Sequence, residues 1–244
     1  MIVEKLDNGI YVAREDLCEG GSKVRFLPQL VKGADHIVYG GSLFCGGAAL
    51  ALSVVGKYLH KRVTLFYAKR AHWHPRQVIA QQNGATLIGV PMGFQKTVLK
   101  RASVYASEHG ALVLPIGFDM QVAEEALMDV MMQVRHRYGV FESVYCACST
   151  GMLTRSLARA FPEAEIVATV VGLKTYREKS NLPANVTMVD WPAVLSRPVK
   201  TPTPFPCCPY YERKAWMTLL DREKPPTVRR VLFWNVLGDV GVIA

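Results

Sequence analysis

The sequence lacks the features of several specialised classes of protein. Met1–Lys5 contains no basic segment followed by an apolar run, so the start does not predict a secretory signal peptide. Glycine and proline number 19 and 14 among 244 residues, which excludes a collagen-like or low-complexity chain. Hydrophobic residues make up 50% of the chain, too many for an intrinsically disordered protein. The length suits one large domain or two small ones.

Charge is missing from Ile37 to Gly56, a stretch long enough to be considered as a membrane span. It contains Gly40-Gly41-Ser42 and Cys45-Gly46-Gly47 ahead of an Ala/Leu/Val run. A glycine-rich turn leading into a buried helix explains this order better than a span does. We therefore expect a soluble, cytoplasmic protein that does not contact membranes.

The cysteines lack the C-x2-C spacing of zinc sites, because they occur as Cys146-x-Cys148 and Cys207-Cys208 pairs with Cys18 and Cys45 apart. No secretory signal precedes them, so a disulfide framework is not expected. We expect free thiols in a reducing compartment and no bound metal.

Acidic residues are absent between Asp35 and Glu108, and the interval holds nine cations. The chain has 29 Lys+Arg and 20 Asp+Glu, a formal charge of +9, so these cations equal its whole excess. Such a region attracts polyanions or anionic substrates, although a solvated basic face without a partner is equally open from charge alone. Aromatic residues among the cations could stack on nucleic-acid bases, but positions in strand and helix cores explain most of them. The cations are Lys57, Lys61, Arg62, Lys69, Arg70, Arg76, Lys96, Lys100 and Arg101, and the aromatics are Tyr58, Phe66, Tyr67 and Trp73.

Apolar periodicity alternates between strand and helix, with short Gly/Asn breaks, which predicts an α/β domain with a parallel sheet. A proline-rich segment, 198–209, is expected to cross in an extended form. The predicted strands are 10–13, 36–39, 62–67, 86–90, 111–114, 143–146, 165–171 and 231–234; the predicted helices are 23–30, 48–59, 76–83, 98–109, 122–138, 153–161 and 214–221.

Residues with chemical potential lie at the joints of this pattern. Lys23 follows Gly20-Gly21-Ser22 at a helix start, where the pKa of an ammonium group is lowered, which suits a Schiff-base lysine; a solvated lysine is the plainer alternative. Ser149-Thr150-Gly151 follows a strand and offers backbone N–H groups and hydroxyls to a phosphate, although small residues are common in such turns. Glu212 begins a helix, and Asn235 ends the last strand.

Four segments, in this order, resemble fold-type II pyridoxal-phosphate enzymes, nearest the branch of 1-aminocyclopropane-1-carboxylate deaminase and D-cysteine desulfhydrase. The segments are Arg14-Glu15-Asp16 with Gly20–Arg25, Tyr39-Gly40-Gly41, Cys208–Ala215 and Val231–Asn235. The resemblance runs nearly end to end, and four ordered motifs rarely coincide by chance. It implies parallel twisted sheets flanked by helices with a trimmed small domain. The expected larger, cofactor-binding domain is 1–35 with 110–244, and the smaller α/β domain is 36–109.

The resemblance also implies pyridoxal 5'-phosphate (PLP) as cofactor and a homodimer. Lys23 would hold the cofactor and then shuttle the Cα proton, and Glu212 would keep the pyridine nitrogen protonated. Tyr211 is either a second acid/base group or a packing tyrosine. The remaining expected contacts are Ser149, Thr150 and Gly151 to the phosphate, Asn235 to the cofactor, and Gly40, Gly41 and Ser42 to the substrate.

Departures from the family pattern indicate a different substrate. The family's serine and asparagine after the Gly-Gly pair have no counterpart in register within 42–46, and the closing motif has Asn235-Val236 in place of His-Thr. This combination is similar to compact phage enzymes of thymidine hypermodification. The first hypothesis is therefore an isomerase that converts N-linked to C-linked glycyl-thymidine in DNA, in the host cytoplasm, with DNA held by the basic 57–101 region. A lyase or deaminase of small amino acids and a non-catalytic nucleic-acid-binding protein remain open.

Overall fold

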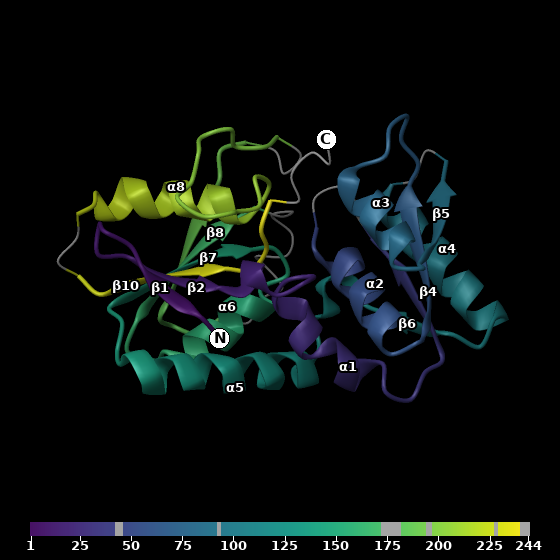
Figure 1. Ribbon diagram of the computed structural model, residues 1–244, viewed down its shortest axis with the longest axis horizontal. Coiled ribbons are helices and arrows are strands. Elements are labelled where there is room, and N and C mark those ends of the chain that lie inside the picture. The colour runs from purple at the N-terminus through teal and green to yellow at the C-terminus, as the bar shows by residue number, and fades with distance from the viewer. Residues whose placement is uncertain (42–45, 92–93, 172–181, 194–196, 227–228, 240–244) are drawn as a thin grey trace. The chain divides into compact units, whose positions relative to one another are not determined.

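The computed structural model describes residues 1–41, 46–91, 94–171, 182–193, 197–226 and 229–239 (Figure 1). The chain divides into two compact units. Unit 1 comprises Met1–Leu17 and Asp119–Asp239, and the described part of unit 2 is Cys18–Phe118. No helix in the described ranges is both long enough and apolar enough to cross a bilayer.

Unit 1 is built on a six-stranded sheet in the order β1-β2-β10-β7-β8-β9. β1 pairs with β2 antiparallel, and all other neighbours are parallel, so the carboxyl ends of five strands share one edge. The elements are β1 Val3–Lys5, β2 Tyr11–Arg14, the 3-10 helix η1 Glu15–Leu17, α5 Gln121–Tyr138, β7 Ser143–Cys148, α6 Met152–Ala160, β8 Glu165–Val170, β9 Val186–Asp190, α8 Glu212–Glu223 and β10 Val231–Asn235.

Helices cover both faces of this sheet: α8 lies on one face, and α5 and α6 on the other (Figure 1). Under α8, the buried rings of Trp216 and Phe233 meet edge to face with centroids 5.2 Å apart, in a cluster that includes Tyr145. On the opposite face, the Cys146 Sγ lies 3.6 Å from the Thr154 Oγ1 of α6. Burying large apolar side chains contributes about 1.5–3 kcal/mol each, so this two-sided core fixes the strand ends rigidly.

Unit 2 is built on a four-stranded, fully parallel sheet in the order β5-β4-β3-β6. Val38 and Phe66 pack with Val98 of α4 on one face, and Gly56 of α2 lies against Val63 on the other. The elements are the 3-10 helix η2 Ser22–Arg25, α1 Leu27–Leu30, β3 His36–Gly40, α2 Ala48–Tyr58, β4 Arg62–Ala68, α3 Pro75–Gln82, β5 Thr86–Val90, α4 Gln95–Glu108, β6 Leu112–Leu114 and the 3-10 helix η3 Ile116–Phe118.

The division between the units differs from the predicted boundaries at 35/36 and 109/110. The segment 18–35 belongs to unit 2 because it packs there. A Cβ on Gly20 would lie only 3.1 Å from the Cα of Ala51 in α2, and the ring centroids of Phe26 and Phe118 are 6.1 Å apart. Lys23 therefore lies in unit 2, whereas Ser149, Thr150 and Gly151 lie in unit 1.

The α/β class and every long predicted helix and strand are confirmed. Two strands were not predicted, β1 Val3–Lys5 and β9 Val186–Asp190, both at the ends of the unit 1 sheet. The predicted helix 23–30 is instead η2 followed by the single turn α1, because Pro28 lacks the N–H that would continue one helix across both.

Candidate active site

The loop between β7 and α6 has the backbone of an anion-binding turn. Gly151 adopts φ +89° and ψ −12°, the left-handed region that favours glycine, and it is the N-cap of α6. It offers no side chain, and no side-chain cap hydrogen bond is present at this helix start. Ser149 and Thr150, the two hydroxyl residues before it, are half-buried. The positive end of the α6 dipole is therefore left for an external anion.

Cys146, Cys148 and Cys207 are buried in unit 1, and Cys148 immediately precedes this loop. The Gly151 backbone N–H hydrogen-bonds the Cys148 sulfur, but burial is the larger effect and raises the pKa of Cys148. Burial likewise raises the pKa values of Cys146 and Cys207, and the negative charge of Glu212 adds to both shifts. These thiols are therefore protonated and unreactive at neutral pH. The five described cysteines form no disulfide, and no three His, Cys, Asp or Glu side chains among the described residues gather as a metal site.

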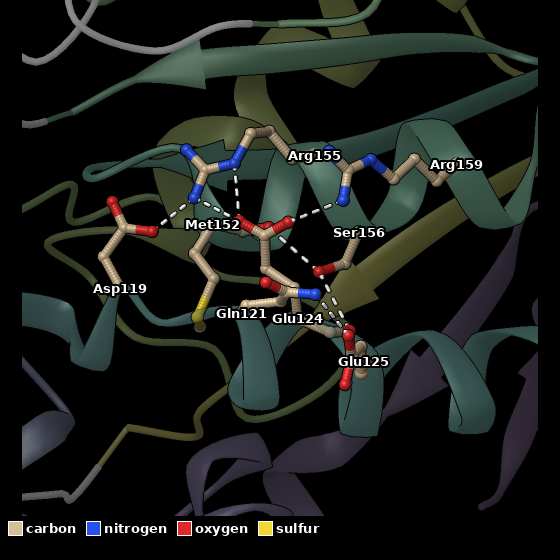
Figure 2. Close-up of polar contacts among 8 residues, drawn as sticks. All are labelled: Asp119, Gln121, Glu124, Glu125, Met152, Arg155, Ser156 and Arg159. Atoms are coloured by element: carbon tan, nitrogen blue, oxygen red, sulfur yellow. Dashed lines mark hydrogen bonds and ion pairs between the residues drawn. The ribbon is translucent and has the colours of Figure 1, made fainter.

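An ion-pair network fixes the first two turns of α6 against α5 (Figure 2). Glu124, buried on α5, accepts from the Arg155 Nε at 2.6 Å and from the Arg159 Nη1 at 3.0 Å. Arg155 also pairs with Asp119. Figure 2 shows the Glu124 carboxylate lying between the two guanidinium groups, with the Ser156 hydroxyl beneath it. This network positions the helix whose first turn would face the anion.

Glu212 lies at the same edge of unit 1 as the β7–α6 loop. It is the first residue of α8 and is buried. At the far end of α8, Arg222 binds Glu165, the first residue of β8, at 3.0 Å, so the start of α8 lies toward the carboxyl ends of the strands. The Cys208 N–H, just before α8, donates to the Leu237 carbonyl just after β10, at 3.0 Å.

Asn235 ends β10 at this edge and is fully buried. Its Nδ2 donates to the Pro206 carbonyl at 2.8 Å, which fixes the amide orientation, and its Oδ1 has no hydrogen-bond partner among the described residues. A buried amide oxygen without a partner costs free energy. Asn235 thus presents an unsatisfied acceptor at the edge where Glu212 begins α8.

Thr169 is a candidate site residue that the sequence analysis missed. It is paired in register with Ala147 near the carboxyl end of β8 and is fully buried. The residues two positions earlier on β7, β8 and β10 belong to the core under α8, so Ala147, Thr169 and Asn235 face α8 as well. The Thr169 Oγ1 has no hydrogen-bond partner in the part of the chain that the structure describes. A threonine within the apolar strand Glu165–Val170 was the available signal.

Lys23 lies in unit 2 on the turn η2, and its side chain is half-buried. Gly20 and Gly21 before it adopt φ values of +87° and +75°, which residues with a Cβ atom rarely adopt. A Cβ on Gly20 would also lie 2.8 Å from the Val24 Cγ1. The Gly-Gly pair is thus needed to bring the Lys23 turn against α2.

The predicted substrate loop follows β3 in the same unit. A Cβ on Gly40 would lie 3.0 Å from the Ala102 Cβ, so glycine permits close contact with α4. The Gly41 N–H donates to the Phe66 carbonyl at 3.0 Å and is therefore engaged within the sheet. Any backbone donor to a substrate would have to follow Gly41. Ser42, the third predicted substrate contact, lies outside the described residues.

Tyr211, the predicted second acid/base group, precedes Glu212 as the N-cap of α8. Its ring is partly buried and packs against the core under α8. In unit 2, His36 begins β3 and therefore lies at the amino edge of the sheet, opposite the edge of Gly40 and Gly41. Its Nε2 is 2.9 Å from the Thr64 Oγ1. Burial, with the nearby charges of Arg62 and His109, lowers its pKa, so this imidazole is neutral and structural.

No protein-family model matches the sequence, and no curated protein is significantly similar to it. Solved structures are similar over nearly the whole chain. An O-acetylserine-dependent cystathionine beta-synthase from Helicobacter pylori has a TM-score of 0.73 at 13% identity, covering 97% of this chain and 92% of its own. The processed form of threonine deaminase isoform 2 from Solanum lycopersicum has 0.70 at 12%, covering 96% and 76%. A pyridoxal 5'-phosphate-dependent aspartate racemase has 0.68 at 14%, covering 95% and 84%. The chain therefore has the fold-type II architecture that its motifs predicted.

Proposed function

We propose that this protein is a PLP-dependent enzyme that acts at the α-carbon of an amino-acid group. One observation supports this most strongly: Glu212, Asn235 and the uncapped start of α6 lie at one edge of the unit 1 sheet. The fold agrees, since a pyridoxal 5'-phosphate-dependent racemase shares it.

The residues at this edge fit the cofactor chemically. A phosphate would take the backbone N–H groups at the start of α6 and the hydroxyls of Ser149 and Thr150. The Asn235 Oδ1 and Thr169 Oγ1, both buried and lacking a partner among the described residues, have hydrogen-bonding capacity for a polar ring substituent. Glu212 is a carboxylate suited to a protonated pyridine nitrogen. Each demand of the cofactor thus meets a residue of matching chemistry.

Each proposed role belongs to a residue of this chain. Lys23 would hold the cofactor and, once displaced by the substrate amine, accept the α-proton on its Nζ and later release a proton to the product. Glu212 would hold a proton on the pyridine nitrogen. Gly151 and its neighbours would bind the phosphate. When bound, the cofactor supplies an electron sink for the charge that develops at the α-carbon.

The specific reaction that we propose is isomerisation of N-linked to C-linked glycyl-thymidine in DNA. One Cα–H bond and the C–N bond to the thymine methylene break, and one C–C bond and one N–H bond form. Atoms and electrons balance without an oxidant or a second substrate. The acid-free interval 36–107 supports a polyanionic substrate, and the missing serine/asparagine register supports a substrate other than a small free amino acid.

A lyase or deaminase of small amino acids is the second candidate. The solved structures of similar fold include a threonine deaminase and a hydrogen sulfide-producing enzyme, which supports it. It predicts release of pyruvate, ammonia and sulfide from D-cysteine, or of 2-oxobutyrate and ammonia from 1-aminocyclopropane-1-carboxylate, in the absence of nucleic acid. The isomerase predicts no ammonia.

The test begins with the visible absorbance spectrum of the purified protein incubated with PLP. We expect a band that Lys23→Ala lacks and that Lys32→Ala, an exposed lysine beyond α1, retains. Mass spectrometry of a glycyl-thymidine substrate and an ammonia assay with D-cysteine then separate the two reactions. No band in the wild-type protein would refute the enzyme and leave a non-catalytic nucleic-acid-binding protein.

A further inference from the structure

The acid-free interval is divided by the fold between the two edges of the unit 2 sheet. All four strands are parallel, so their amino ends lie at one edge and their carboxyl ends at the other. Arg62 begins β4 and Lys69 follows its end. The 7 residues of β4, at about 3.3 Å each, separate the two edges by about 23 Å. Lys61, whose Nζ donates to the Ala34 carbonyl at 2.7 Å, lies at the amino edge with Arg62.

The aromatic residues of the interval are also divided. Phe66 and Tyr67 are 5% and 9% exposed and belong to the core of the unit, so they cannot stack on an external base. Tyr58, at the end of α2, donates its hydroxyl to Glu19 at 2.6 Å. Of the four aromatic residues that the sequence offered, Trp73 therefore remains as an exposed ring without a nearby acidic residue in its own loop.

Two strongly exposed rings lie on neighbouring loops at the carboxyl edge. Trp73 is 46% exposed in the loop between β4 and α3, and Phe94 is 82% exposed as the N-cap of α4, in the loop after β5. The two strands are adjacent, and the Lys69 N–H donates to the Val90 carbonyl at 3.0 Å where both end. Both loops thus leave the sheet from neighbouring points (Figure 1).

Cations surround these rings. Lys69 and Arg70 are exposed between β4 and Trp73, and Lys96 and Lys100 are exposed on successive turns of α4 after Phe94. No acidic residue occurs anywhere in the strands, loops and helices between β3 and the end of the third turn of α4. The edge therefore has a positive field of one sign together with exposed π-faces.

We propose that this edge, defined as Lys69, Arg70, Trp73, Phe94 and Lys96 and called the Trp73–Phe94 edge, binds nucleic acid with unpaired bases. The bases stack on the two rings, and the phosphates contact the lysines and the arginine. Rings on loops cannot stack on bases inside a duplex, so the strand must be single or the base flipped out. The proposal deepens and rests on the proposed action on DNA-linked amino acids.

The position of the edge suits that substrate. Gly40 ends β3, which lies beside β4, and the N–H of the next residue, Gly41, donates to the Phe66 carbonyl within β4. The predicted substrate loop and the Trp73–Phe94 edge therefore follow neighbouring strands at the same edge of one sheet. A nucleotide held by the rings has its modified base within the same unit that carries Lys23.

The test is fluorescence-anisotropy binding of the full-length, PLP-loaded protein to a labelled oligothymidylate. We expect Trp73→Ala with Phe94→Ala to weaken binding at least tenfold, because each lost base stack corresponds to about 5- to 150-fold in affinity. Lys69→Ala with Lys96→Ala should reduce the log–log salt slope by about 1.4, at about 0.7 for each lost phosphate contact. The matched control, Lys61→Ala with Arg62→Ala at the amino edge, should change neither quantity by a comparable amount.

Each outcome decides the proposal. Wild-type affinity in the double aromatic variant, or an equal loss in the amino-edge control, overturns it. Binding of anionic phosphatidylserine vesicles in place of oligonucleotide, with the same dependence on both rings, assigns the edge to a lipid surface and overturns it too. The visible absorbance band and the thermal midpoint of each variant exclude misfolding as the cause.

Failure of this proposal is distinguishable from failure of the proposed reaction. Binding is measured with unmodified oligothymidylate and requires no turnover. Conversion is measured on the free glycyl nucleoside, which does not require the protein to bind a DNA strand. Conversion together with unaltered binding by the aromatic variant refutes the Trp73–Phe94 edge alone. Ring-dependent binding without conversion refutes the isomerase alone.

Discussion

Thr169→Val tests the assignment of the unit 1 edge to the cofactor. The Thr169 hydroxyl is fully buried and has no hydrogen-bond partner among the described residues, which costs the apoprotein about 1–3 kcal/mol. Valine has the same shape without the hydroxyl, so we expect the apoprotein to gain about 1 kcal/mol. In a chain of this size, that raises the melting temperature by about 2–4 °C.

The chain offers a matched control at the opposite edge. Ser143 begins β7, is also fully buried, and its Oγ likewise has no partner within the described ranges. Ser143→Ala should therefore stabilise the apoprotein to a similar extent. Because Ser143 lies at the amino ends of the strands, this variant should bind PLP as the wild type does.

Bound PLP should make the stabilities of the two variants differ. If the Thr169 hydroxyl hydrogen-bonds the bound cofactor, its loss weakens binding about tenfold or more, since hydrogen bonds to charged groups contribute about 1.5–3 kcal/mol. At a fixed excess of PLP, Thr169→Val then loses about 1.4 kcal/mol of ligand-induced stabilisation relative to the wild type. Thermal melts without PLP measure the stability of the apoprotein, and melts with PLP measure the additional stabilisation by the cofactor. An equal PLP-induced shift in Thr169→Val and Ser143→Ala would refute the assignment.

Three further predictions concern stability. Glu124→Gln should lower the free energy of unfolding, measured in urea, by about 1.5–3 kcal/mol. The substitution removes the negative charge that binds both Arg155 and Arg159 of α6. Gly56→Ala should cost about 1–3 kcal/mol, since its Cβ would lie 2.3 Å from the Val63 Cγ2. His36→Gln should flatten the pH dependence of stability. The pKa of His36 is lowered in the folded state, so the unfolded chain binds the extra proton, and stability falls as pH drops below about 6.5, by up to about 1.4 kcal/mol per pH unit.

Neighbouring or similar residues provide controls for these variants. Glu125→Gln, exposed on the next position of α5, should change stability by less than about 0.5 kcal/mol. Gly33→Ala should be nearly neutral, because no atom lies within 4 Å of the added Cβ. His136→Gln, exposed on α5, should leave the pH profile unchanged. Equal effects in a variant and its control would contradict the corresponding contact.

The sequence predicted the alternating elements well where apolar periodicity was strong. α5 and β7 were placed within two residues of their ends because each has a continuous buried face. β1 and β9 were missed, since both border the sheet and have few buried side chains. A strand at a sheet border buries little, so its pattern carries little apolar signal.

Motifs of adjacent residues can be related to local geometry, whereas composition cannot. Arg14-Glu15-Asp16 recurs in the resembled family, and here the Arg14 guanidinium holds Asp16 with two hydrogen bonds of 2.9 and 2.8 Å, which fixes the turn η1 after β2. Such local geometry is encoded by adjacent residues and is visible in sequence. Thr169 is different, because it becomes significant only through its register with Ala147.

The basic interval also shows that the sequence alone does not reveal which residues lie together in the fold. As a sequence it is one region of nine cations, but a parallel sheet separates Arg62 from Lys69 by the full length of β4. Charge counted along the chain therefore overestimates the field at either edge. Phe94 gains its importance only from its strand's place beside β4, which brings its loop next to that of Trp73. Contacts between residues far apart in sequence, rather than composition, decide which cations and which rings can act on one ligand.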